Sequence, residues 1–164
     1  MDVAEMMDAA RRRLSELPRE RLGELVVPRR ILGIARPPRI EPRGTAWHLG
    51  VLLLTDDEVL ATGDILRARE DVRRGFTAES QRERAALAAA ARRGGFAEGE
   101  PVHIGWERLD PAALARGEAS GPLAMLGSVP GIRWSRTGAL VPLEGYLDDR
   151  IALAGPAGLR RDLG

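Results

Sequence analysis

The first seventeen positions alternate between apolar and polar residues with the period of a helix. The apolar residues recur at steps of three and four and are Val3, Met6, Met7, Ala10, Leu14 and Leu17. This spacing places them along one side of a helix. Proline is disfavoured inside a helix, so Pro18 ends it. The pattern predicts an amphipathic N-terminal helix over residues 1–17.

The next stretch, 18–44, has no such period and is rich in proline and arginine. Its prolines are Pro28, Pro37, Pro38 and Pro42. Each proline lacks a backbone N–H, so long regular structure is disfavoured here. Only Arg30–Ala35 has the composition of a short strand. We expect these residues to form an ordered wrap or a mobile arm.

The clearest strand pattern follows the arm. Ala46–Leu54 is rich in residues that favour strands, and Val59–Ala68 has a similar composition. Between them lie Thr55-Asp56-Asp57-Glu58, which are residues typical of a turn. The three segments together predict a β-hairpin.

The second half of the chain mixes helices and strands. An alanine-rich helix is expected to begin at Thr77, as the N-cap, and to stop at Gly94. The later expected elements are a strand at Val102–Glu107, a helical turn at Asp110-Pro111, strands at Ile132–Ser135 and Ala139–Val141, and a helix at Leu143–Ala154. Strands and helices do not alternate regularly, which favours an α+β fold over a parallel βαβ fold.

The fold class expected from this order is α+β, with an antiparallel or mixed sheet of about five strands covered by two to three helices. A chain of 164 residues has the length of one domain. We therefore expect a single domain over 1–164. Its parts are the N-terminal helix 1–17, the arm 18–44, an α+β core 45–154 and a frayed tail 155–164.

Composition removes several classes of function. The chain contains no cysteine, and all 25 basic residues are arginine. Disulfides, thiol nucleophiles, cysteine-based zinc sites, lysine Schiff bases and the Walker A loop are therefore excluded. No signal peptide or long apolar run is present. We expect a cytoplasmic protein with no membrane partner and no cofactor.

Three segments resemble a family of small, uncharacterised actinobacterial proteins, some of which are called glutaminases. They are Trp47–Leu54, Ala85–Gly99 and Gly121-Pro122-Leu123. The resemblance covers most of residues 45–154 and implies no defined active site. A serine–lysine glutaminase needs a lysine, and a glutamine amidotransferase needs a cysteine nucleophile. Because the chain has neither, glutamine hydrolysis would require threonine, serine or carboxylates in another arrangement.

His48 and His103 are the candidates for acid–base chemistry, because imidazole titrates near neutral pH. Each lies in an expected strand, and a glycine follows two residues later, Gly50 or Gly105. Residues two apart share a face of a strand, so each imidazole would lie beside a gap. If the two strands are neighbours, one shallow site would contain both. The alternation around Trp47 in one strand and around Trp106 in the other instead predicts that both imidazoles face outward, away from the core.

Acidic residues and arginines are the remaining candidates for binding. Asp56-Asp57-Glu58 offers oxygen ligands for a divalent cation, but the chain lacks a calcium-binding loop motif, so we expect no metal site. Residues 1–43 hold ten arginines against seven acidic residues. The expected anion-binding residues are Arg29, Arg30, Arg36, Arg39, Arg43, Arg73 and Arg74. The net charge of only +1 and the lack of interleaved aromatic residues make nucleic acid a weaker candidate.

The first and last helices suggest self-association. Met6 and Met7 on one, and Leu143, Leu147 and Ile151 on the other, would suit a homodimer contact or the core of one chain. The function expected overall is that of a non-enzymatic protein with an arginine-rich surface for an anionic or protein partner. The alternative is a small hydrolase or acid–base enzyme that uses His48 or His103 with a nearby carboxylate. The sequence leaves open which of the two applies.

Overall fold

The computed structural model describes residues 1–71 and 78–155, and the chain divides into two compact units. Unit 1 is built from Met1–Arg19, Ala46–Thr62 and Glu107–Gly164, and unit 2 from Glu20–Thr45 and Gly63–Trp106. Neither unit is one continuous stretch of sequence. The expectation of one domain over 1–164 stays a prediction, and the expected frayed tail lies almost wholly outside the described residues.

The α+β class expected from the sequence is confirmed. Hydrogen bonds order one mixed sheet of seven strands as β5-β6-β1-β2-β3-β4-β7, and a second sheet of three as β10-β9-β8. The strands are β1 (Glu20–Val26), β2 (Arg39–Leu49), β3 (Leu52–Leu54), β4 (Val59–Ala61), β5 (Asp64–Arg67), β6 (Pro101–Ile104), β7 (Glu107–Arg108), β8 (Leu123–Leu126), β9 (Val129–Arg133) and β10 (Leu140–Pro142). The helices are α1 (Val3–Leu14), α2 (Glu79–Arg93), the 3₁₀ helix η1 (Pro111–Arg116) and α3 (Leu143–Ala154). There are thus more strands than the five expected.

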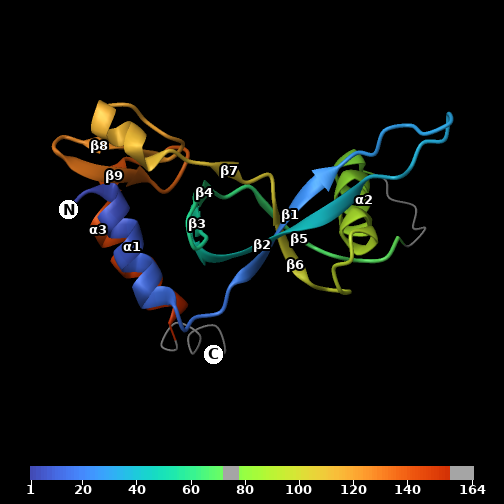
Figure 1. The fold of residues 1–164 in the computed structure, drawn as a ribbon, viewed down its shortest axis with the longest axis horizontal. Helices are drawn as coiled ribbons and strands as arrows, with labels where there is room; N and C mark the ends of the chain where they lie inside the picture. Colours follow the sequence, from blue (N-terminus) through green and yellow to red (C-terminus); the bar gives the residue numbers. More distant parts are fainter. Residues whose placement is uncertain (72–77, 156–164) are drawn as a thin grey trace. The chain divides into compact units, whose positions relative to one another are not determined.

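Unit 1 buries the apolar stripe of its first helix. The side chain of Asp2 caps α1 by accepting a hydrogen bond from the backbone N–H of Glu5, which forms part of a capping box at the start of the helix. α1 and α3 pack against each other (Figure 1). The residues named above for self-association, Met6, Met7, Leu143, Leu147 and Ile151, are all buried in this core. They therefore stabilise unit 1 itself, and self-association stays a prediction without a defined surface.

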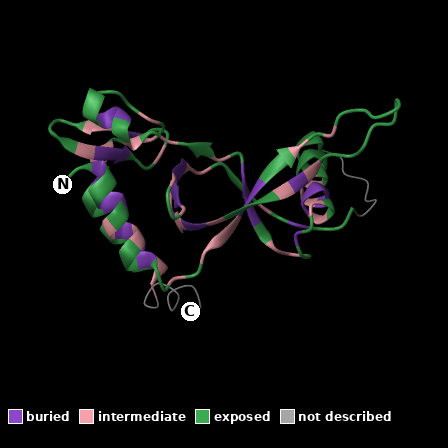
Figure 2. Ribbon diagram, in the orientation of Figure 1, coloured by how far each residue is buried: buried purple, intermediate pink, exposed green. Residues whose placement is uncertain are grey.

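Unit 2 has its own core beneath α2. Its buried residues are Ile40, Ala68, Ala90, Ala91, Phe96, Val102 and Ile104. β1 and β6 pair in parallel, with Leu22 opposite His103, and β5 pairs with β6 in the antiparallel sense. Small alanine side chains on α2 let the helix approach the strands closely. Figure 2 shows these residues as the purple side of α2.

The arm 18–44 is more regular than its prolines suggest. β1 and the first half of β2 lie within it, and the segment between them forms the loop of a long hairpin (Figure 1). Pro28, Pro37 and Pro38 fall in that loop, outside both strands, and Pro42 is exposed in β2. The short strand expected at Arg30–Ala35 is wrong, because these residues form the hairpin turn. β1 was missed because β6, its parallel partner, lies about 80 residues later in the chain.

The single strand expected at Ala46–Leu54 is in fact two strands. β2 ends at Leu49, β3 begins at Leu52, and the two pair in the antiparallel sense. Gly50 provides the turn with a φ of +65°, which suits glycine. The Tyr146 hydroxyl from α3 accepts from the N–H of Val51 and donates to the carbonyl of Leu49, both at 2.8 Å. Tyr146, which is distant in the sequence, thus stabilises a turn within a stretch that the sequence pattern predicts to be a single strand.

The described helices agree with the remaining expectations in most respects. α3 spans Leu143–Ala154, as expected. α2 begins at Glu79 with Ala78 at its N-cap, whereas the expected cap Thr77 lies outside the described residues. β9 and β10 overlap the strands expected at Ile132–Ser135 and Ala139–Val141, and β8 was not anticipated. The single strand expected at Val102–Glu107 is wrong, because β6 ends at Ile104 and Glu107 belongs to β7, which pairs with β4. Within residues 1–71 and 78–155, no helix has both the length and the apolar character to cross a membrane.

Candidate functional site

The loop of the β1–β2 hairpin is a long exposed part of unit 2. We refer to residues 27–38 as the arm loop. Apart from Pro28, which is half-buried, every one of its residues is exposed (Figure 2, green). Ile31 and Ile34 form an isolated antiparallel bridge, and Ile34 N–H donates to the Ile31 carbonyl at 3.0 Å. The turn between them consists of Leu32 and Gly33, with φ values of +53° and +76°. The loop is therefore an ordered tip, because positive φ at both central residues is the geometry of a tight hairpin turn.

Three of the expected anion-binding arginines lie on this loop. Arg29, Arg30 and Arg36 are exposed, and none of them forms an ion pair with an acidic residue of the described chain. No acidic residue lies between Glu24 and Glu41. The guanidinium groups are therefore available to an anionic ligand. Exposed arginines offer paired N–H groups that match phosphate and carboxylate geometry.

The other two described candidates are already neutralised by acidic neighbours. Arg39 binds Glu41 at 2.7 Å, and Arg43 binds both Glu24 and Glu41. The hydrogen bond from Arg39 lowers the pKa of Glu41, and the hydrogen bond to Glu24 raises the pKa of Arg43. These two arginines stabilise the base of the hairpin. Arg73 and Arg74, also expected to bind anions, lie outside the described residues.

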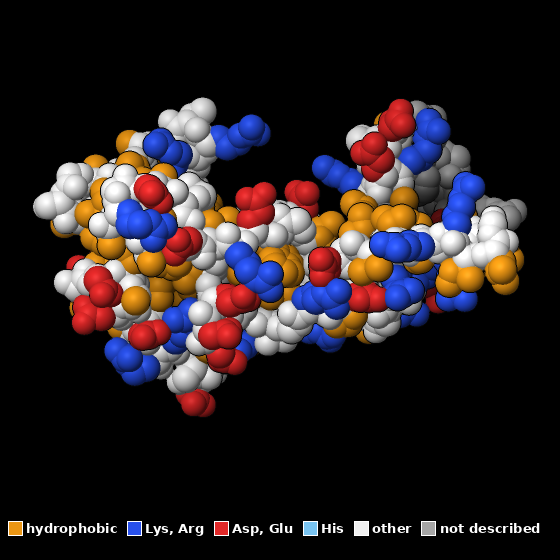
Figure 3. Space-filling view, turned by 45° about the horizontal axis from the view of Figure 1, so that its top comes forward, with side chains coloured by type: hydrophobic (Ala, Val, Ile, Leu, Met, Phe, Trp, Pro, Cys, Tyr) orange, Lys and Arg blue, Asp and Glu red, His pale blue; other side chains and the backbone are white. Residues whose placement is uncertain are grey.

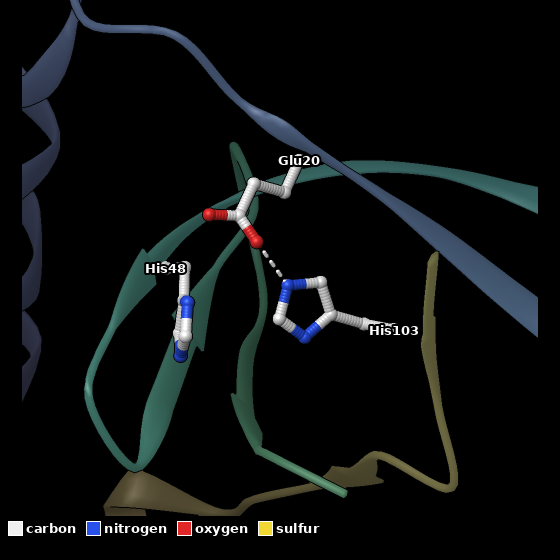
Figure 4. A group of neighbouring side chains, drawn as sticks. All are labelled: Glu20, His48 and His103. Atoms are coloured by element: carbon white, nitrogen blue, oxygen red, sulfur yellow. Dashed lines mark hydrogen bonds and ion pairs between the residues drawn. The ribbon is translucent and has the colours of Figure 1, made fainter. Parts of the chain in front are cut away.

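His103 does not face outward as the alternation predicted. It is fully buried on β6, where Val102 and Ile104 are buried as well. Both faces of the strand are thus covered, a situation that strict alternation cannot reveal. The parallel pairing of β1 with β6 brings Glu20 to the imidazole, and His103 Nε2–H donates to Glu20 Oε2 (Figure 4). The side chain of Glu20 is 40% exposed, so the buried imidazole is linked to a carboxylate that reaches solvent.

His48 belongs to unit 1. It is half-buried on β2, and its Nε2 lies 2.9 Å from the carbonyl oxygen of Gly50. The gap expected beside it at Gly50 is absent, since a Cβ there would lie 2.2 Å from the Tyr146 hydroxyl. The prediction of one site with both imidazoles stays a prediction.

The acidic turn Asp56-Asp57-Glu58 is held by protein partners. Arg19 binds Asp56 at 2.6 Å, and this hydrogen bond lowers the pKa of the carboxyl group. Arg108 binds Glu58 at 2.6 Å, and Asp57 accepts from the hydroxyl of Thr55. The carboxylates therefore serve to fix the turn.

A cavity of about 410 Å³ in unit 1 lies beside this turn. Three of its four acidic groups are paired with arginines, namely Asp8 with Arg11, Glu58 with Arg108, and Asp110 with Arg116, and the fourth, Asp57, accepts a hydrogen bond from the hydroxyl of Thr55. Arg11 also donates to the carbonyls of Thr55 and Glu58, which joins α1 to the turn. The sequence offered no signal for this role, since Arg11 sits in an ordinary run of three arginines. The charges of the cavity are satisfied within the chain, so it does not favour a charged ligand.

Comparison with protein-family models, with curated proteins and with solved structures finds no match to the chain. The resemblance to the actinobacterial family therefore stays a prediction. Two features of unit 2 are therefore the candidates for a functional site: the arginines of the arm loop, and the hydrogen-bonded pair formed by Glu20 and His103.

Proposed function

We propose that the chain is a non-enzymatic binding protein whose arm loop recognises an anionic partner. The observation that carries this proposal is the placement of Arg29, Arg30 and Arg36 on an exposed hairpin tip without acidic neighbours. No acidic residue in the described part of the chain forms an ion pair with them. A guanidinium group without an internal partner retains its full capacity to bind phosphate or carboxylate.

The distribution of charge between the units supports the proposal. Unit 2 contains 14 arginines against 10 acidic residues, whereas unit 1 contains 11 against 14. The small overall charge thus combines a net +4 on unit 2 with a net −3 on unit 1. An anion is attracted to the positive unit even though the whole chain is almost neutral. The cytoplasmic location expected from the composition is part of the same proposal.

Removal of the three loop arginines is expected to weaken polyanion binding. The triple variant Arg29→Ser, Arg30→Ser, Arg36→Ser should bind labelled heparin at least about 20-fold more weakly than the original chain at low salt, because three ionic contacts are lost. The original chain should lose roughly 10- to 100-fold in affinity between 50 and 200 mM salt. Fluorescence anisotropy measures both quantities.

The matched control removes the same charge from unit 1. Arg12, Arg133 and Arg136 are exposed there, and their replacement by serine should change heparin affinity far less. Equal weakening by both triple variants would show that only net charge matters. Absence of heparin binding by the original chain at 20 mM salt would contradict the proposal.

The hydrogen bond between Glu20 and His103 favours a second candidate function, acid–base catalysis. A carboxylate that accepts a hydrogen bond from an imidazole fixes its tautomer and orientation, and it stabilises the imidazolium form that acid–base catalysis uses. The candidate reaction is hydrolysis of a small amide or ester, which includes glutamine. The complete burial of His103 fits a purely structural role equally well, so this candidate ranks second.

Activity assays on histidine variants test the second candidate. Ammonia release from glutamine and p-nitrophenyl acetate hydrolysis should fall by about 100-fold in His103→Gln and in Glu20→Gln, which is the usual contribution of one acid–base group. His48→Gln shows which of the two histidines is used. Circular dichroism confirms that each variant is folded. If the original chain turns over neither substrate faster than buffer, hydrolysis of this kind is excluded.

A further inference from the structure

The tip of the arm loop is apolar as well as cationic. Of the eleven large hydrophobic side chains that are exposed in the described chain, five lie within residues 25–34. Within the arm loop, Leu32 is 95% exposed, Val27 and Ile34 are each 69% exposed, and Ile31 is 58% exposed. Figure 3 shows hydrophobic side chains gathered at the outer end of the hairpin, at the right of the view, with arginines beside them. Such clustering of exposed apolar surface marks an interaction site.

Leu32 makes no contribution to folding that would explain its presence. It is the one non-glycine residue with positive φ in the described chain, and leucine is disfavoured in that conformation. The turn that it forms with Gly33 favours asparagine or aspartate at this position. An almost fully exposed leucine also gains nothing from burial. Leu32 is therefore unfavourable at this position in two ways, because leucine rarely adopts a positive φ and because its apolar side chain is exposed to water.

The arginines of the arm loop lie on both sides of this tip. Arg29 and Arg30 precede Ile31, and Arg36 follows Ile34 by two residues. The loop is thus apolar at its end and cationic directly behind it. The surface of an anionic bilayer is complementary to this arrangement, because its negatively charged phosphates lie above its apolar acyl chains.

Other macromolecules fit this tip less well. A stable protein interface takes about 20 to 30 residues from each partner, and the arm loop has only twelve. Duplex DNA accepts an apolar wedge at a base step, but four aliphatic side chains exceed what one step can cover. The arm loop also has no aromatic residue for stacking on single-stranded bases. A lipid surface imposes no such limit on shape or number.

We propose that the tip inserts Leu32 and its aliphatic neighbours into the surface of an anionic lipid bilayer, while Arg29, Arg30 and Arg36 bind the headgroup phosphates. This inference rests on the proposed anion-binding function and specifies its partner. It replaces the expectation of no membrane partner, which was based on the lack of a signal peptide and of a spanning segment. Insertion of a hairpin tip requires no such segment.

Vesicle co-sedimentation tests the inference. The full chain should bind vesicles of 70% phosphatidylcholine and 30% phosphatidylglycerol, and bind pure phosphatidylcholine vesicles much more weakly. Leu32→Asn should lower the partition coefficient at least about tenfold, since one leucine is no longer buried in lipid. The triple arginine variant should lower it by roughly 100-fold, at about fivefold per arginine. Ile65→Ser removes an aliphatic side chain of β5 that is 52% exposed and lies outside the arm loop, and it should have no effect.

Leu32→Asn also separates lost binding from lost folding. Asparagine is favoured at positive φ, so the melting temperature of the variant should equal or exceed that of the original chain. Its heparin affinity should stay within about twofold, because all arginines remain.

Four outcomes would overturn the inference. Heparin binding without vesicle binding would refute the lipid partner and leave the anion-binding function in place, whereas loss of both would refute the two together. Equal vesicle binding by Leu32→Asn and the original chain would show that the tip does not insert. Duplex DNA binding that Leu32→Asn abolishes, without vesicle binding, would assign the tip to nucleic acid.

Discussion

Gly94→Ala is expected to destabilise unit 2 by about 3 kcal/mol or more. Gly94 follows the last residue of α2, and a Cβ built on it would lie 1.5 Å from the carbonyl oxygen of Ile40. That oxygen belongs to the backbone of β2 and cannot move aside as a flexible side chain would. The helix must shift away from the strand, which opens the core around Phe96. Urea unfolding followed by tryptophan fluorescence measures the loss, and hydrogen exchange locates it in residues 20–45 and 78–106.

Gly95→Ala is the matched control for this effect. Gly95 has a φ of +101°, but no atom lies within 4 Å of the position of its Cβ. Its replacement should therefore cost only the conformational penalty of about 1 kcal/mol. If the two variants lose similar amounts of stability, α2 does not pack against β2 as closely as the structure shows.

Tyr146→Phe is expected to destabilise unit 1 by about 2 to 4 kcal/mol. The hydroxyl group is buried and bonds two backbone atoms in the turn between β2 and β3. Without it, the N–H of Val51 and the carbonyl of Leu49 both lose a partner, and each unsatisfied buried group costs about 1 to 3 kcal/mol. Thermal unfolding monitored by circular dichroism provides the measurement.

Ser120→Ala provides the comparison for loss of a hydroxyl. Ser120 Oγ also accepts a backbone hydrogen bond, from Asp110 at 2.8 Å, but it lies where water can replace it. We expect a cost below about 1 kcal/mol there. A loss at Tyr146 no larger than the loss at Ser120 would show that the turn is held by other contacts.

The sequence predicted those elements that can be recognised from the pattern of neighbouring residues alone. α3 was recognised from its period, and α1 from its apolar stripe and proline stop. β1 was not recognised, because it is held between β2, on the far side of the arm loop, and β6, about 80 positions away in the sequence. The turn at Gly50 that separates β2 from β3 was missed for a similar reason, because it is stabilised by Tyr146, a residue of α3. Each of these features depends on a contact between distant parts of the chain.

The candidate sites show the same limit. The exposure of Arg29, Arg30 and Arg36 could be expected, because prolines and the lack of acidic neighbours keep them out of the fold. The exposure of Ile31 and Ile34 could not, because apolar residues with strand composition are normally buried. The burial of His103 and its bond to Glu20 both follow from the pairing of β1 and β6, which the sequence did not reveal.

The assembly of unit 1 from three separate segments affects how the chain folds during synthesis. α1 leaves the ribosome about 130 residues before α3, the helix against which it packs. At about 5 to 20 residues per second, this delay lasts roughly 6 to 26 s. All the residues of unit 2 are translated during that interval. The synthesis of unit 2 is therefore complete before that of unit 1, and the apolar side of α1 stays without its partner until α3 is made, unless a chaperone covers it.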